Sequence, residues 1–233
     1  MKPKHPIETA VFVLLLVAFN CWIAPASSAL FPAELRSGEL WRLFTYPWAH
    51  ISAYHLLLDA AAFLCLYDML RCKAPTRLFH LCSCILFSGL VPVLLDPRLP
   101  TVGLRGLSGV AHGLVIVTSL EAVRSKTKSE RYFGWIILAG VCAKCLVELA
   151  TGTVLFANYH LGNVGIPIPT CHVGGALGGL ISYGLVALAG ARQPFQFLSL
   201  QSSSSDSQSP APKSPATQFP FRTCRTRASH LPT

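Results

Sequence analysis

The sequence predicts an all-α polytopic membrane protein, and three observations lead to that fold class. First, 52% of the 233 residues are hydrophobic and only 12% are charged, whereas a soluble domain carries roughly 25% charged residues. Second, the mean hydropathy is +0.50. Third, the apolar residues gather into six continuous runs with short polar stretches between them. Together these features exclude an ordinary soluble domain.

Each apolar run approaches the roughly 20 residues that a helix needs to cross about 30 Å of hydrocarbon. The runs cover about residues 9–30, 50–69, 78–95, 107–122, 132–151 and 170–190. The first run resembles a secretory signal peptide in its basic start, but its apolar part is too long for one and five more runs follow. We therefore expect a six-transmembrane-helix bundle over 9–190, preceded by a short segment over 1–8.

The segment over 191–233 has a different composition from the bundle. It is rich in Ser and Pro, includes the run Ser202–Ser205, and shows no apolar periodicity. Such a segment cannot bury enough apolar surface to fold, so we expect a disordered tail.

The basic residues predict the orientation of the bundle. The net charge is +9, but Lys and Arg lie between the apolar runs and in the tail, which favours a topology signal over a nucleic-acid surface. They concentrate in residues 1–8, in the loops over 71–77 and 124–131, and in the tail. By the positive-inside rule these parts are cytoplasmic. Both termini then lie inside, and runs two, four and six cross from outside to inside.

A serine and a histidine are expected at similar depth near the outer boundary. Ser108 is the second residue of run four, and His172 is the third residue of run six. A single serine in a membrane helix usually serves packing or backbone hydrogen bonding. A histidine at matching depth on a parallel run instead indicates a nucleophile and its base.

Glycines explain how these two runs could come together. Small residues four apart let membrane helices approach backbone to backbone. Such pairs are Gly109 with Gly113, Gly174 with Gly178, and Gly175 with Gly179. Close approach would bring the serine hydroxyl within hydrogen-bond range of the imidazole.

More polar side chains collect at the outer end of run two. His50 and His55 lie at its start, and Asp59 is one helical turn beyond His55 on the same face. Polar groups inside a membrane are costly, so these are candidates for function.

A metal site is the first alternative to nucleophilic catalysis. Potential ligands are His50, His55, His112, His172 and Asp59. The sequence has no H-E-x-x-H motif, and a metal site would leave the serine between glycines unexplained. We therefore predict neither a metal nor another cofactor.

The motifs resemble those of the rhomboid intramembrane serine proteases over about residues 36–190. The similar motifs are Trp41–Thr45 followed by His50, His55 and Asp59; the run Gly106-Leu107-Ser108-Gly109; and His172 followed by Gly175 and Gly179. This resemblance implies a six-helix rhomboid-like bundle that acts as a serine endopeptidase within the membrane.

One branch of that family fits more closely. The run from Gly106 to Gly113 has His112 where most rhomboids carry an aromatic residue, and Lys144 and Glu148 stand one turn apart in run five. Both features resemble the bacterial rhombosortases. The resemblance implies a protein of the bacterial inner membrane whose active site opens to the outer side. Its substrates would be membrane-anchored proteins ending in a GlyGly-CTERM tail: a glycine-rich patch, a span and a basic end.

The resemblance also implies roles for these residues. Ser108 would attack the scissile carbonyl, and His172 would take its proton and pass it to the leaving amine. The sequence shows no third carboxylate to orient His172, so a dyad is expected. His112 would pack against His172 and position it, or alternatively act as the base itself. The Ser108 backbone N–H, His55 and residue 59 would form the oxyanion hole, and His50 would brace the first loop.

Three points stay open from the sequence. Rhomboids generally carry Asn where this chain has Asp59; a protonated Asp could donate to the oxyanion, whereas an ionised one cannot and would instead hold His55. Lys144 and Glu148 are either a neutralised structural pair or substrate-recognition residues facing the cavity. A non-catalytic pseudoprotease that binds membrane clients is the alternative function.

Overall fold

The computed structural model describes residues 3–23, 25–155 and 161–191. The tail expected over 191–233 lies, apart from residue 191, outside the described residues. Throughout the described part the chain is helical, without a β-strand; a single isolated bridge joins Leu30 to Leu104.

Six long helical segments form the bundle and correspond to the six apolar runs. They are α1 (Pro6–Val17) continued by the π-helical turn η1 (Ala18–Trp22), α5 (Ala53–Met69), α6 (Ala74–Leu95), α8 (Ser108–Val123), α9 (Lys128–Thr151) and α10 (Thr170–Ala191). Short helices lie in the connections: α2 (Pro25–Ser28), α3 (Pro32–Arg36), α4 (Arg42–Thr45), η2 (Tyr46–Trp48) and α7 (Leu99–Val102).

Not every helix is long enough to cross a membrane alone. In the described residues, α6, α9 and α10 pass by length and hydropathy, and the bent pair Arg42–Trp48 with Ala53–Met69 makes a fourth candidate. The segments Pro6–Trp22 and Ser108–Val123 are apolar but shorter. The structure thus confirms the all-helical fold in the described residues, with three or four candidate membrane spans, and a count of six crossings stays a prediction.

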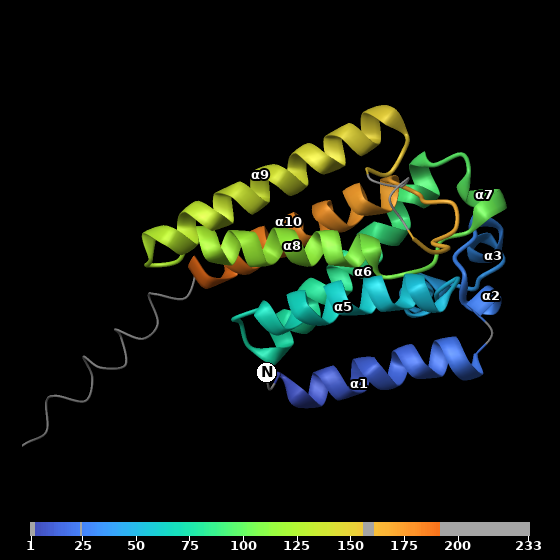
Figure 1. The fold of residues 1–233 in the computed structure, drawn as a ribbon, viewed down its shortest axis with the longest axis horizontal. Helices are drawn as coiled ribbons and strands as arrows, with labels where there is room; N and C mark the ends of the chain where they lie inside the picture. Colours follow the sequence, from blue (N-terminus) through green and yellow to red (C-terminus); the bar gives the residue numbers. More distant parts are fainter. Residues whose placement is uncertain (1–2, 24, 156–160, 192–233) are drawn as a thin grey trace, which may run out of the picture. The chain divides into compact units, whose positions relative to one another are not determined.

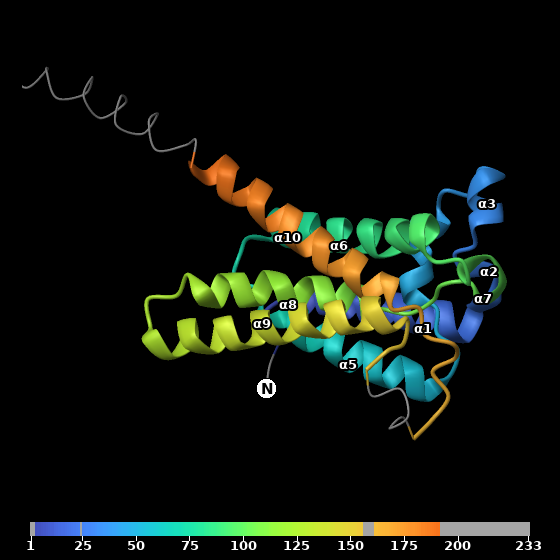
Figure 2. The same ribbon diagram turned by 90° about the horizontal axis from the view of Figure 1, so that it is seen from above.

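Helix α10 packs between α6 and α8, and glycines make both contacts possible. A methyl group on Gly175 would collide with the Gly109 carbonyl of α8, and one on Gly179 with the Gly113 carbonyl. Figures 1 and 2 show α8 and α10 side by side, with α9 on the outer side of α8. Two of the three glycine pairs predicted from the sequence therefore bring the helices of Ser108 and His172 together. The third, Gly174 with Gly178, packs instead against the backbone of α6.

Helix α1 lies beside α5, on the side of the bundle away from α9 (Figure 1). Aromatic side chains join these two helices. Phe12 stacks on Trp48 with ring centroids 5.7 Å apart and meets Phe63 edge-on at 5.2 Å. In the π-helical turn, the Asn20 side chain donates to the Trp48 carbonyl (2.8 Å) and accepts from the His50 N–H (2.9 Å). These contacts fix the chain immediately before α5.

The connection into α8 turns at Gly106. This residue has φ +97°, and its N–H donates to the Tyr46 carbonyl at 3.2 Å. A Cβ there would lie 2.6 Å from an Asp59 carboxylate oxygen and 2.8 Å from the His55 ring. Only glycine suits both the backbone conformation and the space, so this turn delivers Ser108 against the polar end of α5.

Candidate active site

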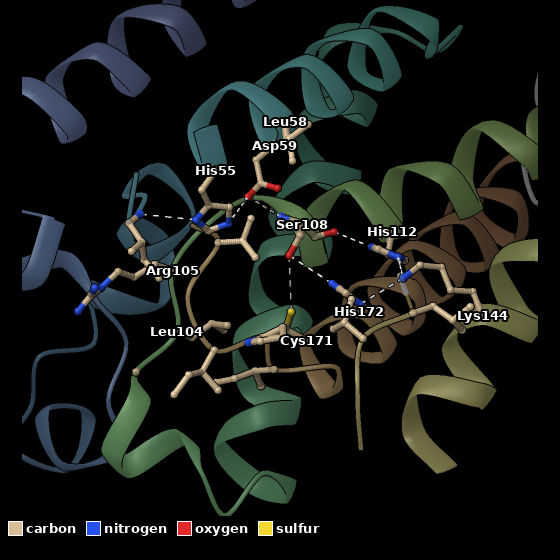
Figure 3. A pocket seen from close by; sticks show the side chains of 18 residues that line it. His55, Leu58, Asp59, Leu104, Arg105, Ser108, His112, Lys144, Cys171 and His172 are labelled. Atoms are coloured by element: carbon tan, nitrogen blue, oxygen red, sulfur yellow. Dashed lines mark hydrogen bonds and ion pairs between the residues drawn. The ribbon is translucent and has the colours of Figure 1, made fainter. Parts of the chain in front are cut away.

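Ser108 is the first residue of α8, and His172 is the third residue of α10. The two parallel helices place the Ser108 Oγ 3.3 Å from the His172 Nε2, so one hydrogen bond joins them (Figure 3). Ser108 is half-buried and His172 is buried. The expected pairing of a serine hydroxyl with an imidazole is therefore present in the structure.

The other nitrogen of His172 meets a carboxylate. Its Nδ1 lies 2.6 Å from Glu148 Oε2 in the last turn of α9. Because an ionised carboxylate only accepts, Nδ1 carries the proton, and Nε2 presents a lone pair to the Ser108 hydroxyl. The sequence analysis found no carboxylate that orients His172, and that expectation is wrong. Helix α9 runs opposite to α8 and α10, so its end meets their beginnings.

His112 lies one turn below Ser108 and is held at both nitrogens. Its Nδ1 is 2.7 Å from the Ser108 carbonyl oxygen, and its Nε2 is 3.0 Å from Lys144 Nζ. A carbonyl accepts and an ammonium donates, which fixes a neutral imidazole protonated at Nδ1. The ring stacks on His172, with centroids 4.0 Å apart and planes at 14°. Neither nitrogen reaches the Ser108 hydroxyl, so this geometry does not support His112 as the base.

Asp59 lies on the other side of Ser108 and acts as an acceptor. Its Oδ2 accepts from the backbone N–H of Leu107 (2.7 Å) and of Ser108 (3.2 Å). His55 Nε2 is 3.2 Å from the same oxygen, and His50 Nε2 is 3.4 Å away. Of the two alternatives left open, these contacts match an ionised Asp59 that holds His55. They also occupy the Ser108 N–H that we expected in the oxyanion hole.

His50 is bound to the segment before α5 as well as facing Asp59. Its backbone N–H reaches Asn20, and its Nδ1 lies 3.2 Å from the Trp48 carbonyl oxygen. His50 is 3% exposed. The geometry therefore agrees with a bracing role at the base of the first loop.

A cavity of about 320 Å³ opens beside Ser108 (Figure 3). Its polar lining includes Ser108, His112, Lys144 and His172, whereas much of the rest is apolar. The apolar wall includes Ile51, Leu58, Leu104, Val154, Ile166 and Ile168. An apolar cavity with a few convergent polar groups is typical of a ligand site.

The chain before α10 forms one wall of this cavity and contacts the start of α5. The Ser52 hydroxyl donates to the Asn163 carbonyl, and the Leu161 N–H donates to the Tyr54 hydroxyl at 3.3 Å. Residues 156–160 lie outside the described part. The described contacts place the segment from Leu161 to Pro169 between α5 and α10.

The potential metal ligands fall into two separate groups. Asp59, His50 and His55 surround the Leu107 and Ser108 amides, whereas the ligand atoms of His112, Glu148 and His172 lie within 4.8 Å of one another. Lys144 Nζ contacts the second group, 2.5 Å from Glu148 Oε1. An ammonium at that place neutralises the carboxylate and would compete with a metal ion. The five potential ligands named from the sequence are therefore divided between these two groups.

Comparison with known proteins agrees with the motifs. Residues 37–189 match the family model of the Rhomboid domain. Comparison with curated proteins finds no match. The matched range contains all eight site residues predicted from the sequence. Members of this family are generally intramembrane serine proteases. Because the match covers well over half of the chain, the protein belongs to the rhomboid family.

Proposed function

We propose that this chain is an intramembrane serine endopeptidase with Ser108 as nucleophile and His172 as general base. The hydrogen bond of 3.3 Å between Ser108 Oγ and His172 Nε2 carries the proposal. The Nδ1–H tautomer that Glu148 imposes supports it, because only that tautomer leaves Nε2 free to accept the hydroxyl proton.

In the first step, Ser108 Oγ would bond to the scissile carbonyl carbon while its proton moves to His172 Nε2. The imidazolium would then give that proton to the leaving amine as the C–N bond breaks, which leaves the acyl group as an ester on Ser108 Oγ. Water, deprotonated by His172 Nε2, would hydrolyse this ester and restore the Ser108 hydroxyl. The donors nearest to the nucleophile are the N–H groups of Leu107 and Ser108. To be stabilised as an oxyanion, the carbonyl oxygen of the substrate would have to replace the Asp59 carboxylate as the acceptor of these two N–H groups.

We further propose that the reaction takes place near the outer face of the membrane. The 16 residues of α8 span roughly 24 Å at 1.5 Å per residue, which is less than the hydrocarbon thickness of about 30 Å. The nucleophile at the start of α8 would therefore lie within the bilayer. The distribution of Lys and Arg supports cytoplasmic termini and an outward-facing site. The resemblance to the rhombosortases supports a bacterial inner membrane.

For substrates we propose membrane-anchored proteins with a C-terminal GlyGly-CTERM-type tail. The rhombosortase-like pattern of His112, Lys144 and Glu148 supports this class. The cavity supports it too, because a glycine-rich segment has no side chains to collide with the walls formed by residues such as Leu104 and Ile168. Its carbonyl groups could then approach Ser108 closely.

A matched pair of reporter substrates tests this function. Both would carry the same span and basic end, and one would have Leu in place of the glycines of the patch. In lipid vesicles, the protein should cleave the glycine form, and a fluorophosphonate probe should label Ser108. Equal cleavage of both forms would contradict the substrate class alone. Absence of cleavage together with an unlabelled Ser108 would favour the non-catalytic, client-binding alternative.

A further inference from the structure

Glu148 is the one carboxylate of the described residues that contacts His172. It is fully buried, with 0% exposure, and comes from a helix that runs antiparallel to those of the serine and the histidine. Its Oε2 is 2.6 Å from His172 Nδ1, and its Oε1 is 2.5 Å from Lys144 Nζ and 2.9 Å from the Leu155 N–H. Three donors thus surround a single carboxylate.

These contacts define the charge state of Glu148. Lys144 and the Leu155 N–H can only donate at these positions, and His172 has to donate from Nδ1 if its Nε2 is to accept from Ser108. A neutral carboxylic acid would direct its own O–H at one of these donors. The hydrogen-bond geometry is therefore satisfied by an ionised carboxylate and a neutral His172 with the proton at Nδ1.

We infer that Glu148 is the third member of the hydrolytic machinery, a positioning residue that orients His172 and stabilises its charged form. The inference rests on the proposed function. As the Ser108 proton reaches Nε2, the imidazolium would lie between the nucleophile and the Glu148 carboxylate. The proton would leave with the amine, and Glu148 would stay ionised throughout.

Lys144 has a distinct part in this arrangement. Its ammonium neutralises Glu148 and donates to His112, whose ring stacks on His172 and whose Nδ1 binds the Ser108 carbonyl. A closed circuit of contacts therefore runs from the Ser108 carbonyl through His112, Lys144, Glu148 and His172 to the Ser108 hydroxyl. A buried carboxylate without this partner would be strongly destabilised. We assign Lys144 to holding Glu148 in place.

The substitution Glu148→Gln tests the inference because it keeps the shape and removes the charge. The amide NH₂ has to face either His172 Nδ1–H or the donors Lys144 and Leu155, so one donor–donor contact always results. We expect kcat to fall roughly a hundredfold or more, with KM changed by less than about threefold because Glu148 does not line the cavity. Glu148→Asp, which keeps the charge, should recover part of kcat.

Control variants separate a loss of His172 orientation from a loss of folding. Glu130→Gln changes a carboxylate of the same helix that binds Arg71 at the opposite end, and it should retain wild-type kinetics. If Glu148→Gln does not fold, Glu148→Asp, which keeps the buried negative charge beside Lys144, provides the second variant: its shorter side chain should lower kcat with KM nearly unchanged, and a wild-type kcat in it would overturn the inference. Each variant is first checked for its thermal unfolding midpoint in the same detergent.

The outcomes distinguish this inference from the proposed function. A folded Glu148→Gln variant with wild-type kcat would overturn the role of Glu148 while cleavage by Ser108 stands. A decrease of the same size in the Glu130→Gln control would also overturn it. Cleavage that persists in Ser108→Ala would instead overturn the serine mechanism itself. The combined Glu148→Gln and Lys144→Met variant should be no slower than Glu148→Gln, and additive losses would contradict the coupling of the two residues.

Discussion

The Asp59 carboxylate accepts a hydrogen bond from the backbone N–H of Ser108, with 3.2 Å between Oδ2 and the nitrogen. The same oxygen accepts the Leu107 N–H at 2.7 Å. In acyl transfer, N–H groups next to the nucleophile stabilise the developing oxyanion. In the resting structure, therefore, the Asp59 carboxylate occupies the N–H groups that would stabilise the oxyanion. In the proposed reaction, the substrate carbonyl oxygen would displace this carboxylate or share the N–H groups with it.

The first prediction concerns Asp59→Asn. The amide oxygen can accept the two backbone N–H groups, and its NH₂ can donate to an oxyanion without carrying negative charge. We expect Asp59→Asn to cleave at least as fast as the wild type. Asp59→Ala should be roughly a hundredfold slower than Asp59→Asn, because it lacks that donor and leaves His55 without its acceptor.

Initial cleavage rates at equal expression measure this difference. If both variants are equally slow, the ionised carboxylate is required to hold His55, and residue 59 is no donor to the oxyanion. That result would leave the Leu107 and Ser108 amides with His55 to stabilise the charge.

The second prediction concerns the contact between α8 and α10. A methyl group at Gly175 would meet the Gly109 carbonyl, whereas one at Gly184 of the same helix meets nothing within 4 Å. Gly175→Ala should force the helices apart, reduce the free energy of unfolding by about 1–3 kcal/mol, and slow cleavage roughly a hundredfold for a displacement near 1 Å. Gly184→Ala is the matched control and should behave as the wild type.

Thermal unfolding and cleavage rates in one detergent check both variants. Retention of full activity by Gly175→Ala would show that close backbone approach is not what sets the Ser108–His172 distance.

The third prediction concerns Asp96, in the loop that follows α6. Asp96 binds Arg98 at 2.8 Å and accepts from the Thr170 hydroxyl at 3.1 Å, while Arg98 donates to the Gly152 carbonyl at 3.1 Å. The Arg98 guanidinium lowers the pKa of Asp96 below its ordinary value. In the unfolded chain an Asp has a pKa of about 3.9. Because the pKa of Asp96 is lower in the folded protein, ionised Asp96 stabilises the fold at any pH above that value. This stabilisation is lost as the pH falls through the pKa of the folded state.

Asp96→Asn should therefore lower stability at pH 7, by roughly 1 kcal/mol because Arg98 is partly exposed. The difference from the wild type should shrink as the pH approaches 3. Unfolding midpoints at both pH values measure it. A deficit that grows toward acid pH would contradict this sign.

The fourth prediction concerns topology. Reporter fusions in the loops over 72–76 and 125–130 should report the cytoplasm, and fusions over 97–101 should report the outer side, because Lys and Arg concentrate in the first two loops. The inverse pattern would place the start of α8, with Ser108, on the cytoplasmic side and remove the argument for an outward-facing site.

Much of the fold could be predicted from the sequence. The apolar runs predicted the long helices. Glycines four residues apart predicted the close contact between α8 and α10 that brings Ser108 to His172. These features are local repeats, which a sequence displays directly. The run over 9–30 did not predict where its helix ends: the helix stops at Trp22, in a π-helical turn, and not near residue 30.

The contacts of Glu148 with His172 and of Asp59 with the Ser108 amide could not be predicted from the sequence. Glu148 is 24 residues from His172, and the contact depends on the rotation and offset of an antiparallel helix, which a run of apolar residues does not specify. Asp59 meets the Ser108 amide because the chain turns at Gly106 with φ +97°. The presence of that glycine was visible in the sequence, but its backbone conformation was not.

The most direct test of the account compares cleavage by the wild type, Ser108→Ala, His172→Ala and the combined variant on one reporter substrate. In the proposed mechanism the two residues act as a unit, so each single substitution should abolish cleavage, and the combined variant should be no slower than either. All variants must unfold at similar temperatures for the comparison to hold. Substantial cleavage by the Ser108→Ala variant would contradict the central claim that this rhomboid is a serine protease.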